Sequence, residues 1–273
     1  MDALRPDDLP QALALSQALN WPYRLEDWQA ALELGRGLAV GSDGRLRATA
    51  LWWPWGEAFA TCGMIIVADA MQRTGIGALI MDELLAEAAG RSVILRSTEA
   101  GLRLYERLGF RPFGRVHQHQ AALSAAPGAR LPAPVRPMAA GDLETIRAID
   151  RRGSGLDRAR LLDALAAAGS VAVVERAATL TGYGIARRWG RGIVIGPVVA
   201  ATADDATALI AFLAARHVGA FVRIDVTESS GLSPWLESQG LPCVDRVTSM
   251  VRGTLPSCAA DATLFALSSQ SLG

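Results

Sequence analysis

The segment that decides the fold reads MIIVADAMQRTGIG and spans residues 64–77. An apolar strand, 64–67, runs into a polar loop, and Gly75 and Gly77 open the helix that follows. Glycine tolerates tight backbone conformations, so main-chain N–H groups can approach a ligand closely. The first N–H groups of a helix have no partner within it and lie at the positive end of its dipole. The segment therefore predicts a phosphate or pyrophosphate site at the helix start, with Arg73 adding a charge-assisted contact.

Two other phosphate-binding motifs that contain glycine pairs fit this segment less well. A dinucleotide-binding turn would need glycine or alanine where Ile80 stands, and an acid at the end of the next strand, where the first acid is only Glu99. A Walker-type loop would need Gly-Lys-Ser/Thr, which does not follow. A helix start that merely needs small residues stays open from this motif alone.

Hydrophobic periodicity predicts the elements around the loop. Apolar residues recur every four positions at Ile76, Ile80, Leu84 and Ala88, which is one face of a helix. The remaining patterns predict helices over 9–18, 26–34, 75–89 and 100–108, and strands over 37–42, 45–53, 58–67 and 93–95. Strands followed by interleaved helices indicate an α+β domain.

Two motifs together point to a known family. The loop QRTGIG at 72–77 is followed about thirty residues later by LYERLGF at 104–110. The pair resembles the acetyl-CoA loop and the closing helix of the GNAT superfamily of N-acetyltransferases, over residues 3 to 120. The resemblance implies an α/β mixed sheet, flanked by helices, whose two central strands splay apart.

The resemblance also implies how acetyl-CoA, the acetyl donor, would bind. The pantetheine arm would lie along strand residues 65–67, and the pyrophosphate would meet the loop amides from Arg73 to Gly77. The expected contacts are Ile65, Ile66, Val67, Gln72, Arg73, Thr74, Gly75, Ile76, Gly77 and Ala78. No metal is expected.

Tyr105 is the expected general acid. An amine attacks the thioester carbonyl, and a strand N–H, expected to be that of Val67, stabilises the oxyanion. The departing thiolate needs a proton, and a tyrosine with a pKa near 10 is protonated at neutral pH and can donate it. The alternative is a tyrosine that only packs the helix onto the sheet.

Glu57 is the candidate general base. It follows the run Trp52-Trp53-Pro54-Trp55-Gly56 at a turn between strands, and the tryptophans would wall an acceptor pocket. The alternative is a solvated turn glutamate beside tryptophans that are core or interface anchors. Asp69 and Glu26 are no stronger as candidates.

A weak repeat, offset by about 130 residues, indicates two copies of one domain. The matching segments, in the same order, are 4–6 with 135–137, 8–9 with 142–143, 38–40 with 171–173, and 105–110 with 236–241. We therefore predict a first copy (1–122), a proline-containing linker (123–137), a second copy (138–252) and a tail (253–273) that adds a strand or crosses the junction.

The second copy is expected to have lost the chemistry. Asp204 and Asp205 stand where the pyrophosphate would bind, and like charges oppose it. These acids suit an empty helix N-terminus instead. Leu236 faces Tyr105 in the repeat and cannot donate a proton.

Composition bounds the remaining possibilities. The 273 residues, 51% hydrophobic, suffice for two cores. Lys plus Arg equals Asp plus Glu at 27 each, which argues against nucleic acid or membrane partners.

Cys62, Cys243 and Cys258 have no metal or redox spacing, and no signal or membrane segment is recognised, so a cytoplasmic location is expected. His117 and His119 have no visible third ligand and suggest an exposed strand at a domain edge.

The sequence thus predicts an acetyl-CoA-dependent N-acetyltransferase that is active in its first copy. The acceptor would be a small-molecule amine or a protein amino group, and a homodimer is possible. A non-catalytic acyl-CoA sensor is the alternative, and acyl groups other than acetyl stay open.

Overall fold

The computed structural model describes residues 1–130 and 132–273; only Leu131 lies outside it. The helices are α1 (Leu9–Ala18), α2 (Leu25–Leu34), α3 (Ile76–Glu87), α4 (Leu102–Arg107), α5 (Leu143–Ser154), α6 (Ala159–Ala168), α7 (Ala203–Ala214) and α8 (Ser233–Ser238). The strands are β1 (Asp2–Ala3), β2 (Arg36–Ser42), β3 (Arg45–Trp55), β4 (Phe59–Val67), β5 (Ser92–Ser97), β6 (Arg111–Ala122), β7 (Val135–Pro137), β8 (Gly169–Arg176), β9 (Thr179–Trp189), β10 (Gly192–Ala200), β11 (Phe221–Thr227), β12 (Cys243–Arg252) and β13 (Thr263–Ala266). Within the described residues, no helix combines the length and apolar character needed to cross a membrane.

The elements predicted for the first copy are confirmed. α1 has the predicted bounds, and α3 begins one residue after Gly75. Among the strands, the largest difference is in β5, which begins one residue before and ends two residues after the predicted 93–95. β3 continues two residues beyond the predicted end at Trp53. Trp53 and Trp55 are both buried, as expected for residues two apart on one face of a strand.

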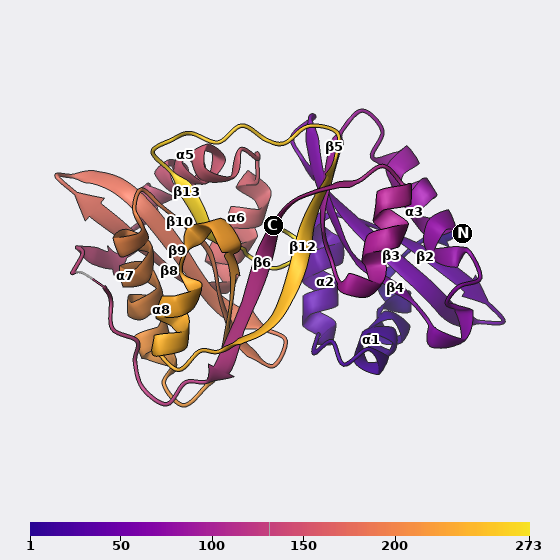
Figure 1. Cartoon of the computed structure of the whole chain (residues 1–273), viewed down its shortest axis with the longest axis horizontal. Helices are drawn as coiled ribbons and strands as arrows, with labels where there is room; N and C mark the ends of the chain where they lie inside the picture. The colour runs from indigo at the N-terminus through magenta and orange to yellow at the C-terminus, as the bar shows by residue number, and fades with distance from the viewer. Residues whose placement is uncertain (131) are drawn as a thin grey trace.

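All the strands join one sheet in the order β1-β2-β3-β4-β5-β12-β6-β11-β13-β10-β9-β8-β7 (Figure 1). Outward from the β12–β6 pair, the second copy repeats the strand order of the first. β4 pairs in parallel with β5, and β10 with β11, whereas the other pairings are antiparallel. The predicted mixed sheet flanked by helices, and its tandem repeat, are therefore confirmed.

The two copies exchange their last strands. β6 follows α4 in the chain but pairs with β11 of the second copy, from Val116↔Thr227 to Ala122↔Phe221. β12 belongs to the second copy but pairs with β5 of the first, from Val93↔Arg252 to Ser97↔Thr248. The division at residues 122 and 138 remains a prediction about the chain, because in the sheet each copy is completed by the other.

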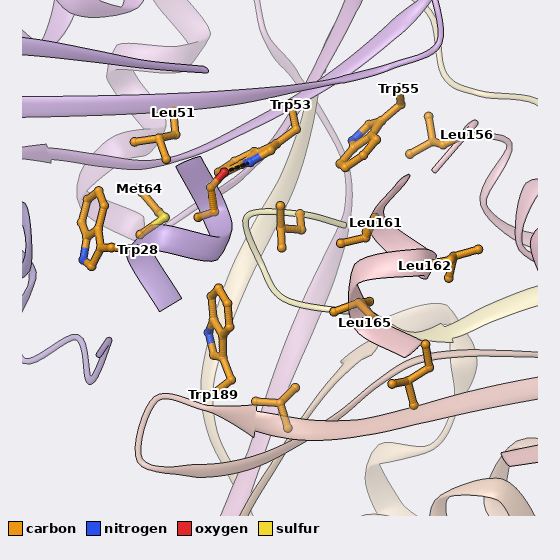
Figure 2. Packing of buried hydrophobic residues seen from close by; sticks show 14 of the residues in the cluster. Trp28, Leu51, Trp53, Trp55, Met64, Leu156, Leu161, Leu162, Leu165 and Trp189 are labelled. Carbon is orange, nitrogen blue, oxygen red and sulfur yellow. Dashed lines mark hydrogen bonds between the residues drawn. The ribbon is translucent and has the colours of Figure 1, made fainter. Parts of the chain in front are cut away.

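A hydrophobic core joins the two copies on the face of the sheet that carries α2 and α6 (Figure 2). Trp53 and Trp55 of β3 lie in the same cluster as Leu161 and Leu165 of α6 and Trp189 of β9. The Trp53 indole Nε1–H donates a hydrogen bond of 2.8 Å to the main-chain oxygen of Ala31. These tryptophans are therefore core and junction residues, which was the alternative to an acceptor-pocket wall.

Candidate active site

A splay between β4 and β5 opens beside the predicted loop. The two strands pair only at Phe59↔Ser92, Ala60↔Val93 and Thr61↔Ile94, and residues 62–67 have no partner on β5. Met64 has a φ of +51°, and the register with β3 shifts nearby, which marks a β-bulge. The strand edge of Ile65, Ile66 and Val67 therefore borders the gap.

The loop presents a row of free amides. Gly75 is the N-cap of α3 with a φ of +94°, a left-handed conformation that favours glycine, and no side chain caps the helix. In the part of the chain that the structure describes, the main-chain N–H groups of residues 73–77 have no hydrogen-bond acceptor. Ala78 and Leu79 are the first to have one, each donating to Gly75 O. Successive free amides at the positive end of a helix dipole suit an anion, so the residues fit a pyrophosphate.

Side-chain hydrogen bonds within residues 69–74 stabilise this loop. Gln72 Nε2 donates to Asp69 Oδ1 at 2.8 Å, and Thr74 Oγ1 donates to Met71 O at 2.6 Å. Asp69 is thus engaged within the loop. A Cβ added at Gly77 would lie 3.5 Å from a Leu104 methyl group and 3.7 Å from one of Val67. Gly77 therefore sits where the end of β4 meets α4, which joins the two sequence motifs in space.

Tyr105 lies on α4, on the face of the sheet that α3 covers. It packs in one core with Cys62 and Leu95, and only 8% of it is exposed. A Cβ added at Gly101 would lie 2.8 Å from the tyrosine ring, so a glycine one turn earlier makes room for it. Burial, with a smaller contribution from Cys62, raises the pKa of Tyr105 well above its usual value. The hydroxyl therefore keeps its proton at neutral pH.

The structure places Glu57 away from the 72–77 loop and from the open part of the splay. It lies in the exposed turn between β3 and β4, at the end of β4 where the strand still pairs with β5. The splay begins only after Thr61. Glu26 is exposed on α2. A catalytic role for Glu57 remains a prediction without support from this placement.

The opposite face of the splay carries residues that the sequence analysis missed. Arg96 of β5 and the 268–273 segment lie there, and the segment reaches Gly63 of β4. A charged residue directly after the apolar run 93–95 was the signal for Arg96. The place of the segment had no signal, because it depends on how the two copies pack.

The second copy differs at each corresponding position. Its strands β10 and β11 pair at only two positions, and β13 from the tail fills the gap by pairing with both. The Thr202 hydroxyl accepts a hydrogen bond from Asp205 N–H at the start of α7, and the Asp205 carboxylate accepts one of 2.5 Å from Arg176. Leu236 is fully buried. These contacts support the prediction that this copy binds no cofactor.

The expectation for His117 and His119 is wrong in one respect. β6 lies in the middle of the sheet, and His119 is fully buried rather than at an exposed edge. Cys243 supplies the third potential ligand that the sequence did not reveal, with all three ligand atoms within 4.8 Å. However, Ser233 Oγ is within 2.9 Å of a nitrogen of each ring, and His119 Nδ1 is 2.8 Å from Leu241 O. The group is a hydrogen-bonded network, and we assign no metal to it.

This network predicts a pH dependence of stability. Burial lowers the pKa of His119, so the folded state keeps the neutral ring while the unfolded chain binds a proton near pH 6.5. The free energy of unfolding is therefore expected to fall as the pH drops below about 6.5. Urea unfolding at pH 7.5 and 5.5 should show a smaller difference for His119→Gln than for the parent protein. Burial also lowers the pKa of His217, so both proteins should carry His217→Gln as a common background. An unchanged difference would contradict the assignment.

Two surface hollows, of about 410 and 320 Å³, lie away from the splay. One includes Arg136 and Asp142, and the other includes Asp2 and Asp8 of the first copy. They occupy corresponding places in the repeat, and neither includes a residue of the 72–77 loop. The hollows are therefore features of the fold rather than of the candidate site.

Comparison with known families identifies the class of protein. A model described as an acetyltransferase (GNAT) domain matches residues 35–112, and a second model with the same description matches 146–266. The chain therefore belongs to the GNAT acetyltransferases and carries two of their domains in tandem. GNAT domains use acetyl-CoA as donor.

Individual relatives agree with this assignment. The uncharacterized N-acetyltransferase YitH of Bacillus subtilis (strain 168) is 29% identical over 167 residues, which cover 60% of this chain and 59% of YitH. A putative acetyltransferase from Pyrococcus horikoshii has the same fold with a TM-score of 0.83, at 22% identity over 100% of this chain and 95% of that one. A tandem GNAT protein from the clavulanic acid biosynthesis pathway matches with a TM-score of 0.65, at 13% identity over 92% and 98% of the two chains.

Proposed function

We propose that the first copy binds acetyl-CoA and transfers its acetyl group to an amine. The free amides of residues 73–77 carry this proposal, because they form an anion site at the mouth of a strand splay. Ile65, Ile66 and Val67 would hold the pantetheine arm, and Arg73 would add charge to the pyrophosphate contact.

The reaction would proceed by direct attack. The amine nitrogen forms a bond to the thioester carbonyl carbon, the Val67 N–H stabilises the oxyanion, and the carbon–sulfur bond then breaks. Tyr105 donates its proton to the departing thiolate, and the acceptor nitrogen loses a proton to water or to a base. Glu57 as that base, and a homodimeric assembly, stay predictions.

A non-catalytic acyl-CoA sensor is the second candidate. One observation favours it: the 268–273 segment covers the face of the splay opposite α3, from which an acceptor would arrive. A sensor needs the phosphate loop but no general acid. The two functions therefore differ in whether amines release the thiol.

Acetyl-CoA binding and amine-dependent thiol release test both functions. Gly75→Glu should weaken acetyl-CoA binding by about 10- to 100-fold, because it sets a carboxylate against the pyrophosphate and strains a left-handed residue. Gly90→Glu is the matched control, since Gly90 has a φ of +83° and open space around it, beyond the other end of α3.

The outcomes separate the candidates. Thiol release that depends on an amine and is lost in Gly75→Glu supports the transferase. Binding without release across a panel of primary amines supports the sensor. Equal binding by wild type and Gly75→Glu, measured by calorimetry, would contradict the proposed loop.

A further inference from the structure

A β-bulge lies where β4 parts from β5. Between two consecutive pairing positions β3 has one residue, Ala50, whereas β4 has two, Met64 and Ile65. An extra residue of this kind bends its strand and increases the local twist. The last position at which β4 pairs with β5 is Thr61, just before the bulge. The bulge is therefore the feature that turns β4 away from β5 and opens the splay.

The main chain beyond the bulge presents its polar groups to the gap. The Ala68 N–H donates a hydrogen bond of 2.8 Å to Arg47 O, so Ala68 faces β3. Successive residues of a strand direct their N–H and C=O groups to opposite edges. Val67 and Ile65 therefore direct theirs into the splay. These are the groups that the proposed function assigns to the oxyanion and to the pantetheine arm.

Thr49 of β3 holds the bulge through its side chain. It is fully buried, and its hydroxyl donates a hydrogen bond of 2.9 Å to Met64 O. Met64 has a φ of +51°, a left-handed conformation that residues other than glycine rarely adopt. Such a conformation persists only where its surroundings fix it. The Thr49 hydroxyl is one of the contacts that fix it, because it gives the Met64 carbonyl a buried partner.

The second copy places a different residue at this point. β3 and β9 are both 11 residues long, and Tyr183 is the fifth residue of β9, as Thr49 is of β3. The Tyr183 hydroxyl donates to the Asp150 carboxylate, so it is directed to a side chain of α5. The copy with the free-amide loop thus has a hydroxyl on its bulge, whereas the copy with the acid-blocked helix start uses the same position for a core contact.

We propose that Thr49 is a positioning residue for acetyl transfer: its hydroxyl fixes the bulge and thereby aims the N–H groups of Ile65 and Val67 at the donor. This inference rests on the transferase function proposed above. Thr49 is fully buried and its hydroxyl is committed to the bulge, so it acts through the main chain and not by contact with acetyl-CoA. Loss of the hydroxyl should therefore disturb the arm and the thioester but not the pyrophosphate loop.

Thr49→Val tests the hydroxyl, because valine keeps the shape of the side chain and removes its donor. We expect kcat/KM for acetyl-CoA to fall by about 10-fold or more, since a buried carbonyl loses its partner. Thr49→Ser keeps the hydroxyl and should stay within about 3-fold of wild type. Thr207→Val is the matched control: Thr207 is equally buried and donates a hydrogen bond of 2.9 Å to Asp204 O, but on α7 of the second copy. It should leave kcat/KM nearly unchanged.

A binding comparison separates positioning from a general loss of structure. The probe is 3′-phospho-ADP, the nucleotide part of coenzyme A, which has the phosphates but no pantetheine arm. By calorimetry, Thr49→Val should bind this probe as wild type does and bind acetyl-CoA more weakly. The comparison applies even where no amine is acetylated.

The outcomes distinguish this inference from the proposed function. Transfer and acetyl-CoA binding that are unchanged in Thr49→Val overturn the inference and leave the proposed function standing. An equal loss of affinity for both ligands, or a loss that Thr49→Ser does not restore, overturns it as well, because the residue then only supports the fold. Wild type that binds no acetyl-CoA would contradict the proposed function and this inference together.

Discussion

Tyr105→Phe is expected to lower kcat by about 100- to 10,000-fold, the range of general acid catalysis. The change removes one oxygen from a side chain that packs against Phe110 and beneath α3, so the ring and its contacts stay. In the described residues the hydroxyl has no hydrogen-bond partner that its loss would orphan. The effect should therefore appear in kcat, with the affinity for acetyl-CoA nearly unchanged.

The pH profile adds a second test of Tyr105. Burial raises the pKa of this hydroxyl, so the proton stays in place well above neutral pH. A proton donor with a raised pKa gives no alkaline fall in kcat between about pH 7 and 9. Full kcat in Tyr105→Phe, with acetyl-CoA bound normally, would show that the tyrosine only packs α4 onto the sheet.

Asp150→Ala is expected to lower the free energy of unfolding by about 3 to 5 kcal/mol, because it leaves a buried guanidinium unpaired. Asp150 is 1% exposed and accepts 3.1 and 2.6 Å hydrogen bonds from Arg158 Nε and Nη2, as well as one from the Tyr183 hydroxyl. The pair lies in the second copy, next to the junction core. Urea unfolding at neutral pH measures the loss.

Two companion variants separate burial from charge. Asp150→Ala combined with Arg158→Met removes both charges and should recover most of the loss. Asp163→Ala breaks the half-exposed Arg147–Asp163 pair and is expected to cost less than about 1 kcal/mol. Equal effects from Asp150→Ala and Asp163→Ala would contradict the importance of burial.

Much of the first copy could be predicted from its sequence. The periodicity located α1 and α3, and the glycines located the loop, because both signals act within a few residues of the chain. The repeat also predicted the second copy and its altered loop. The exchange of β6 and β12 had no such signal, since the residue pattern of a strand does not say which half of the sheet it joins.

The candidate site divides in the same way. The 72–77 loop and Tyr105 lie in local motifs that repeat across a family, so the sequence identified them. Glu57 was a candidate because its turn lies close in sequence to the expected acceptor side, but the structure places it at the paired end of β4. Cys243 joins His117 and His119 only because β12 pairs with β6. Partners from distant segments leave no trace in local spacing.

The sequence by itself determined the mixed α/β class, the tandem repeat, the free-amide loop at the start of α3 and the acid-blocked start of α7. Each depends on backbone and side-chain preferences over a few neighbouring residues. The tertiary structure alone decided that the tail fills the second splay with β13 and then covers the first with residues 268–273. It also decided that Arg96 and Arg158 both lie beside Gly273. The physical reason is that these contacts join segments forty or more residues apart, and only the packed core between the copies brings them together.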